Sequence, residues 1–141
     1  MSVNASSTTN VACVWGANGI SGTGMIDTLI EQSRSEFGKI ICISRRPMQI
    51  DVTDDRIHFI SIDVMAASVD EIVDELIKAD GRTITHMFHY AYIFKMDETE
   101  QDHANKILLQ KALDATEKVA GQNVKCVSLQ TGYKVRENMN G

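Results

Sequence analysis

The fold of this protein is decided by the stretch VACVWGANGISG, residues 11–22. Its first five residues form a continuous apolar run typical of a buried strand, and Gly16, Gly19 and Gly22 follow at spacings of three. Apolar residues then recur at helical spacing as far as Ile30. Because glycine permits a tight turn and a close backbone approach, the stretch predicts a strand, a glycine turn and the start of a helix, where free N–H groups can hold a pyrophosphate.

The same alternation of apolar runs and helical patterns continues along the chain. Further elements are expected as strands at 39–44, 56–62, within 84–92 and at 124–129, and as helices at 68–78, with a capping box, and 97–119. Nearly all-apolar strands separated by helices indicate a parallel sheet covered on both faces. We therefore predict an α/β fold, a Rossmann-like three-layer α/β/α domain with a parallel sheet of about five strands in the order 3-2-1-4-5. Its ligand would bind at the switch point between the first and fourth strands.

Length and composition limit the class of protein. The 141 residues fit one domain, with residues 1–9 as a disordered tail and residues 10–141 as the domain. The formal net charge of −5 opposes a nucleic-acid partner and favours a small-molecule substrate. No apolar run approaches the roughly 18 residues that cross a membrane, and the N-terminus lacks a secretion signal. The expected location is the cytoplasm.

The cysteines and two of the histidines do not indicate a metal site. Cys13, Cys42 and Cys126 each lie in an apolar strand-like run, which favours buried free thiols in a reducing compartment. His86 and His89 are three apart on a strand, so they are expected on opposite faces of the sheet. His89 also ends the fourth strand with Tyr90 and Tyr92, where contact with a ligand and core packing are equal alternatives.

The ends of the second and third strands predict which cofactor is bound. An NAD site places an acidic residue after the second strand, but this chain has Ser44, Arg45 and Arg46 there. A hydroxyl and two guanidinium groups suit a 2′-phosphate and favour NADP(H), although two such arginines can also be a solvated surface pair. Asp63 ends the third strand, where its carboxylate can accept from adenine beside the Val64 backbone, or can simply form a turn.

Several motifs together resemble one family of reductases. GANGISG, SRRP, SIDV, HMFHYAY, Asn105 and LQTGYK are similar to the progesterone 5β-reductase and iridoid synthase branch of the extended short-chain dehydrogenases, over about residues 11–134. The resemblance implies NADPH-dependent reduction of an enone or ketone in specialised metabolism. It implies catalytic Lys134 and the cofactor-binding residues Gly16, Asn18, Gly19, Ile20, Gly22, Ser44, Arg45, Arg46, Asp63, Val64, Ala91 and Gln130. Asn105 is expected to hold the long helix against the active-site strands.

The chain also departs from that family. The tyrosine that the family uses in catalysis lies downstream of the lysine motif, and no tyrosine here precedes Lys134 by four residues. The substrate-binding part is absent, so the domain is expected to be incomplete. A catalytically inactive NADP-binding module, or a fragment of a longer reductase, is therefore the alternative. Val124, Cys126 and Leu129 would then form an exposed edge that a second copy or a complementing chain covers.

Overall fold

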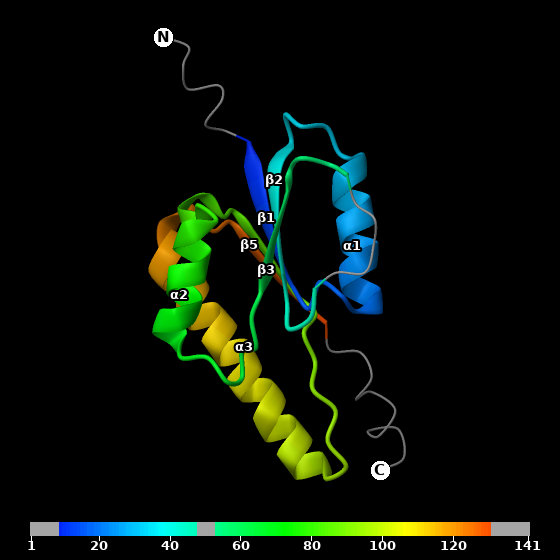
Figure 1. The fold of residues 1–141 in the computed structure, drawn as a ribbon, viewed down its shortest axis with the longest axis vertical. Helices are drawn as coiled ribbons and strands as arrows, with labels where there is room; N and C mark the ends of the chain where they lie inside the picture. Colours follow the sequence, from blue (N-terminus) through cyan, green and yellow to red (C-terminus); the bar gives the residue numbers. More distant parts are fainter. Residues whose placement is uncertain (1–8, 48–52, 131–141) are drawn as a thin grey trace.

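A computed structural model describes residues 9–47 and 53–130, which form one parallel five-stranded sheet with helices on both faces (Figure 1). The strands are β1 (Asn10–Trp15), β2 (Phe37–Ser44), β3 (Ile57–Ser61), β4 (His86–His89) and β5 (Cys126–Leu129). The helices are α1 (Ile20–Glu31), α2 (Val69–Lys78) and α3 (Glu98–Ala120), with short 3₁₀ turns η2 (Gly81–Thr83) and η3 (Gly121–Asn123). The strand order β3-β2-β1-β4-β5 confirms the predicted Rossmann-like α/β fold. The expected tail, apart from Thr9, lies outside the described residues.

Two apolar cores hold the three layers together. Side chains alternate along a strand, so on β1 Cys13 and Trp15 pack toward α2 and α3, whereas Ala12 and Val14 pack toward α1. All four are essentially inaccessible to solvent. Burial raises the pKa of the Cys13 thiol and raises that of Cys42 to about 12, so both cysteines are neutral thiols of the core, as expected. Residues 11–15 of the central strand therefore contribute packing to both cores.

The helix starts follow the sequence pattern, whereas one burial expectation was wrong. The capping box between Ser68 and Glu71 is present at the start of α2. Ile20, the first residue of α1, is 94% exposed. Ile77, in the last turn of α2, is also partly exposed. Cys126 was expected to be buried but is exposed, because β5 is an edge strand and α1 lies over β1 and β2.

A buried arginine that the sequence analysis did not single out closes the end of the sheet opposite the glycine turn. Arg56 is 5% exposed and binds both carboxylate oxygens of Asp54, at 3.0 and 2.8 Å. It also donates to the carbonyls of Ile30, Gln32 and Phe37 at 2.7–3.1 Å. The Arg56 guanidinium holds the pKa of Asp54 well below its usual range. One side chain thus joins the end of α1 to the starts of β2 and β3.

Two further features are absent from the part of the chain that the structure describes. No helix there is long and apolar enough to cross a membrane. Nor do three histidine, cysteine or acidic side chains gather there in a group that could hold a metal ion. His86 and His89 lie on opposite faces of β4, as the strand spacing predicted: His86 packs beside Phe37 and Phe88 on the α1 side.

Candidate cofactor-binding site

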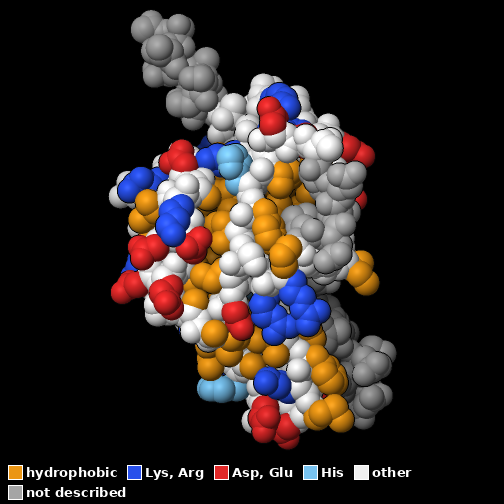
Figure 2. Space-filling view, viewed as in Figure 1, with side chains coloured by type: hydrophobic (Ala, Val, Ile, Leu, Met, Phe, Trp, Pro, Cys, Tyr) orange, Lys and Arg blue, Asp and Glu red, His pale blue; other side chains and the backbone are white. Residues whose placement is uncertain are grey.

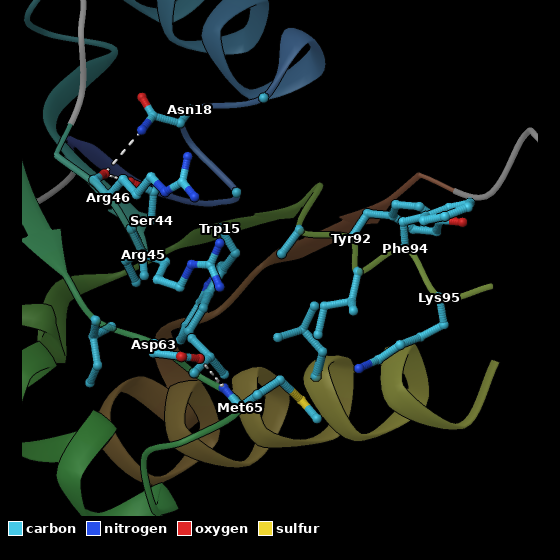
Figure 3. Close-up of a pocket in the computed structure, with 18 residues that line it drawn as sticks. Trp15, Asn18, Ser44, Arg45, Arg46, Asp63, Met65, Tyr92, Phe94 and Lys95 are labelled. Carbon is cyan, nitrogen blue, oxygen red and sulfur yellow. Dashed lines mark hydrogen bonds between the residues drawn. The ribbon is translucent and has the colours of Figure 1, made fainter. Parts of the chain in front are cut away.

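A pocket of about 650 Å³ opens at the carboxyl edge of the sheet, where the glycine turn meets the segments that follow β2, β3 and β4 (Figure 3). In Figure 3 Arg45 and Arg46 enter it from one side, and Tyr92, Phe94 and Lys95 lie on the other. The order β3-β2-β1-β4-β5 makes the gap between β1 and β4 the topological switch point, where ligands of such sheets bind. Its volume is that of a typical small-molecule site.

Most of the sequence-predicted residues meet at this pocket. Its lining includes Gly16, Asn18, Gly19, Ser44, Arg45, Arg46, Asp63, Val64 and Ala91. Three others do not line it: Ile20 begins α1, Gly22 is buried in that helix, and Gln130 is exposed after β5. Lys134 lies outside the described residues. The fold therefore brings together residues from four separate strand ends.

Two of the three glycines in the turn lie where the protein leaves no room for a Cβ atom, and the remaining one does not. Gly16 has a φ of +83°, and a Cβ there would lie 2.5 Å from the Ala91 nitrogen. A Cβ on Gly22 would lie 2.2 Å from the Gly16 oxygen. A Cβ on Gly19 would meet only the same oxygen, at an ordinary 3.5 Å. The first and third glycines therefore permit the turn, and the second leaves open space at the mouth of the pocket.

The N-terminus of α1 is open, which suits an anion. Gly19 is its N-cap and provides no side-chain hydrogen bond, and the first turn contains no acidic residue. By contrast, Ser68 and Asp97 cap α2 and α3, whose first turns are acidic. Free N–H groups and the positive end of the helix dipole are the usual partners of a phosphate. The residues present thus fit the pyrophosphate of a dinucleotide.

Gly22→Ala should lower the free energy of unfolding by about 2 kcal/mol and weaken cofactor binding, because the new methyl group displaces the glycine turn. Gly24→Ala is the matched control in the same helix: its Cβ would have nothing within 4 Å, so we expect unchanged binding and a gain of about 0.5–1 kcal/mol. Urea unfolding and calorimetric titration measure both. Equal effects of the two substitutions would contradict this account of the turn.

The turn after β2 is held by hydrogen bonds to its backbone. The Ser44 hydroxyl and, at 3.0 Å, the Asn18 side-chain amide donate to the Arg46 carbonyl. The Ser61 hydroxyl donates to the Arg45 carbonyl at 3.0 Å. Asn18 therefore joins the glycine turn to the turn after β2. The Ser44 proton is used in a local hydrogen bond, so its hydroxyl holds the Arg46 backbone.

The Arg45 and Arg46 side chains remain exposed at the pocket. Among residues 9–47 and 53–130 neither guanidinium forms an ion pair, whereas Arg34 and Arg56 pair with acidic residues at the other end of the sheet. In the view of Figure 2, basic side chains gather below the middle of the molecule, beside exposed apolar side chains. Two unpaired guanidinium groups on a held backbone are suited to a phosphate.

Asp63 shows the turn-forming contacts that were one of its two alternatives. Its Oδ1 accepts from the backbone N–H groups of Met65 and Ala66, at 3.1 and 3.3 Å. Its Oδ2 accepts from no described group, and the Val64 N–H donates to none. An acceptor beside a donor matches the amine and the ring nitrogen of adenine, so the second alternative stays open as well.

The sequence analysis missed Lys111, which lies on the inner side of α3. Its ammonium donates to the carbonyls of Val64, Met65 and Ala67 at 3.2, 2.9 and 2.7 Å. The sequence could have indicated this residue, because Lys111 lies between Leu108 and Ala112 on the packed face of the helix. A lysine there needs a polar partner. Lys111 thus holds the segment that follows β3.

The segment that follows β4 is fastened to α3 by Asn105, as expected. Its side-chain amide accepts from the Ile93 N–H and donates to the Ile93 carbonyl, both at 2.9 Å.

His89 is buried, and burial lowers its pKa to about 4, so the ring is neutral at pH 7. Tyr90 packs against the core on the α1 side, whereas Tyr92 is 44% exposed and lines the pocket. Core packing therefore describes His89 and Tyr90, whereas contact with a ligand stays open for Tyr92.

The sheet order, the glycine turn after β1 and the pocket at the switch point define a Rossmann-fold domain. The chain belongs to the PRISE-like Rossmann-fold domain family, which matches residues 12–138. The short chain dehydrogenase gsfE of Penicillium aethiopicum is 35% identical over 124 residues, covering 87% of this chain and 32% of that protein. The short chain dehydrogenase sirQ of Leptosphaeria maculans is 30% identical over 132 residues, covering 86% and 33%. The chain spans about a third of these curated relatives.

Solved structures show the same fold at lower sequence identity. A short chain dehydrogenase from Burkholderia cenocepacia, in complex with NADP, aligns with a TM-score of 0.69 and 19% identity over 87% of this chain and 53% of that one. The Bordetella bronchiseptica enzyme WbmG, in complex with NAD, aligns with a TM-score of 0.64 and 17% identity over 86% and 37%. Structures with the same fold thus contain either nicotinamide cofactor, and the fold alone does not choose between them.

Proposed function

We propose that this chain binds NADP(H) and forms the cofactor part of a short-chain reductase that acts on an enone or ketone in specialised metabolism. The observation that carries the proposal is the pair Arg45 and Arg46: two exposed guanidinium groups without a described ion pair, at the strand end where NAD sites place an acid. Its second support is family membership together with relatives named short chain dehydrogenases. A location in the cytoplasm stays a prediction.

In this proposal each part of the pocket holds one part of the dinucleotide. Asn18, Gly19 and Ile20 at the start of α1 would hold the pyrophosphate, and Arg45 and Arg46 would bind the 2′-phosphate. Asp63 and Val64 would bind adenine, while Ala91 and Gln130 would lie on the nicotinamide side. When bound, NADPH supplies a hydride to the substrate.

Lys134 is proposed to act on the reacting end, from outside the described residues. By the family resemblance its cation would hold the nicotinamide ribose and lower the pKa of a phenol that polarises the substrate oxygen. The phenol itself has no candidate by sequence spacing. The alternative function is an NADP-binding module without chemistry or a piece of a longer reductase; the chain spans about a third of the length of these relatives.

The edge of the sheet is the proposed contact with a partner. Val127 and Leu129 on β5 are 46% and 47% exposed, and no described strand pairs with the outer side of β5. Natural proteins usually pair or cover such an edge. We propose that a second copy of the chain, or the remainder of a longer reductase, covers it.

Calorimetric titration of the full chain with NADPH and with NADH tests the cofactor. The expected result is binding with a clear preference for NADPH, and a preference for NADH, or no binding of either, would overturn the proposal. Absorbance of the reduced nicotinamide, followed with a panel of enones, then tests the chemistry. Oxidation would support a reductase, whereas binding without oxidation would support the cofactor module.

A further inference from the structure

We propose that Lys111 is a positioning residue that sets the adenine preference of the site by holding the backbone of residues 64–67. The inference rests on the proposed NADP(H) function and adds to it a residue on a different element, α3. Its basis is one contact set: the Lys111 ammonium donates to the carbonyls of Val64, Met65 and Ala67 at 3.2, 2.9 and 2.7 Å.

This contact set uses the full donor capacity of the side chain. A lysine ammonium has three N–H donors, and here each has its own carbonyl acceptor. Lys111 is partly buried, and it forms no ion pair with an acidic residue in the described ranges. By contrast, Lys118 on the same helix is exposed and lies 3.7 Å from an Asp70 oxygen. The hydrogen-bond partners of Lys111 are therefore backbone carbonyls.

The three carbonyls depend on Lys111 in turn. No other described group donates to them, because the turn bonds of this segment end on the Asp63 carbonyl and on the Asp63 side chain. A carbonyl that loses its donor away from bulk water is costly, so we expect removal of the ammonium to shift the backbone of residues 64–67. The segment carries the Val64 N–H and adjoins Asp63, which are the donor and acceptor proposed for adenine.

A displaced segment should change how well the site recognises adenine more than how well it recognises phosphate. The 2′-phosphate would bind on the loop after β2 and the pyrophosphate on α1, and neither contacts Lys111 through the hydrogen bonds described. The hypoxanthine analogue of NADPH retains the pyrophosphate and the 2′-phosphate, and it replaces the exocyclic amine by an oxygen, which cannot donate to Asp63. Its ring N1 carries a hydrogen and cannot accept from the Val64 N–H. The ratio of the two dissociation constants therefore reports the adenine contact alone.

The experiment compares the full chain with Lys111→Met and with the control Lys118→Met, titrating each with NADPH and with its hypoxanthine analogue. We expect a preference for NADPH of about tenfold in the wild type and the control, falling to less than about threefold in Lys111→Met. Should Lys111→Met fail to fold, Lys111→Gln, which retains a donor, is titrated in its place and should lose part of the preference.

Each other outcome has a distinct meaning. A wild type that binds neither nucleotide overturns the NADP(H) function, and this inference with it. A wild type that binds both equally leaves the NADP(H) function in place and overturns the adenine assignment and this inference. A Lys111 variant with the wild-type preference shows that the lysine only stabilises the fold. Amide exchange of residues 65–67 without ligand supports the contact if it rises in Lys111→Met and stays unchanged in Lys118→Met.

Discussion

Replacing Arg45 and Arg46 together by alanine should weaken NADPH binding by about 100-fold and leave NADH binding nearly unchanged. Both guanidinium groups are exposed at the pocket, on a turn whose carbonyls are held by Ser44, Asn18 and Ser61. Only NADPH carries the 2′-phosphate to which they would form charge-assisted hydrogen bonds. Calorimetric titration of the wild type and the double variant with each cofactor measures the effect.

The control must remove the same charge elsewhere. Arg34→Ala with Arg82→Ala also removes two positive charges, at positions that do not line the pocket. Since long-range attraction between exposed charges is screened by salt, we expect this control to change NADPH binding less than about threefold. An equal loss for both cofactors in the Arg45 and Arg46 double variant would contradict the assignment of these residues to the 2′-phosphate.

Arg56→Met should lower the free energy of unfolding by about 3–5 kcal/mol. The substitution retains an apolar side chain but removes every donor to Asp54 and to the carbonyls of Ile30, Gln32 and Phe37. These acceptors lose a partner that is 5% exposed to solvent and cannot be replaced by bulk water without opening the cluster. Urea unfolding followed by circular dichroism at pH 7 measures the difference.

Arg34→Met is the matched control for that loss. Arg34 lies in the same cluster and pairs with Asp55 at 2.6 Å, but its side chain is 63% exposed. An exposed ion pair contributes little, so this variant should lose no more than about 1 kcal/mol. Similar losses in the two variants would mean that charge, and not the buried hydrogen bonds, stabilises this end of the sheet.

The fold was predictable because its determinants are local in sequence. Apolar runs mark β1 and β2, an alternating pattern marks β3, an amphipathic pattern marks α2, and the capping box at Ser68 is complete within four residues. The glycine spacing likewise predicted the turn at Gly16, where a positive φ and the 2.5 Å approach to Ala91 require it. The order of the sheet is that of the dinucleotide-binding fold, which the glycine turn and the alternation of strands and helices indicate, so it too was accessible from the pattern.

The architecture, the place of the pocket and the position of Arg45 and Arg46 at its edge could be read from the residues alone. The side chains that fasten one segment to another became visible in the folded chain. Lys111 and its Val64 acceptor are 47 positions apart, and Arg56 and the Ile30 carbonyl are 26 apart. No periodic pattern encodes such pairs, because a hydrogen bond between a side chain and a distant carbonyl depends on the packing of whole elements and not on the residues beside it.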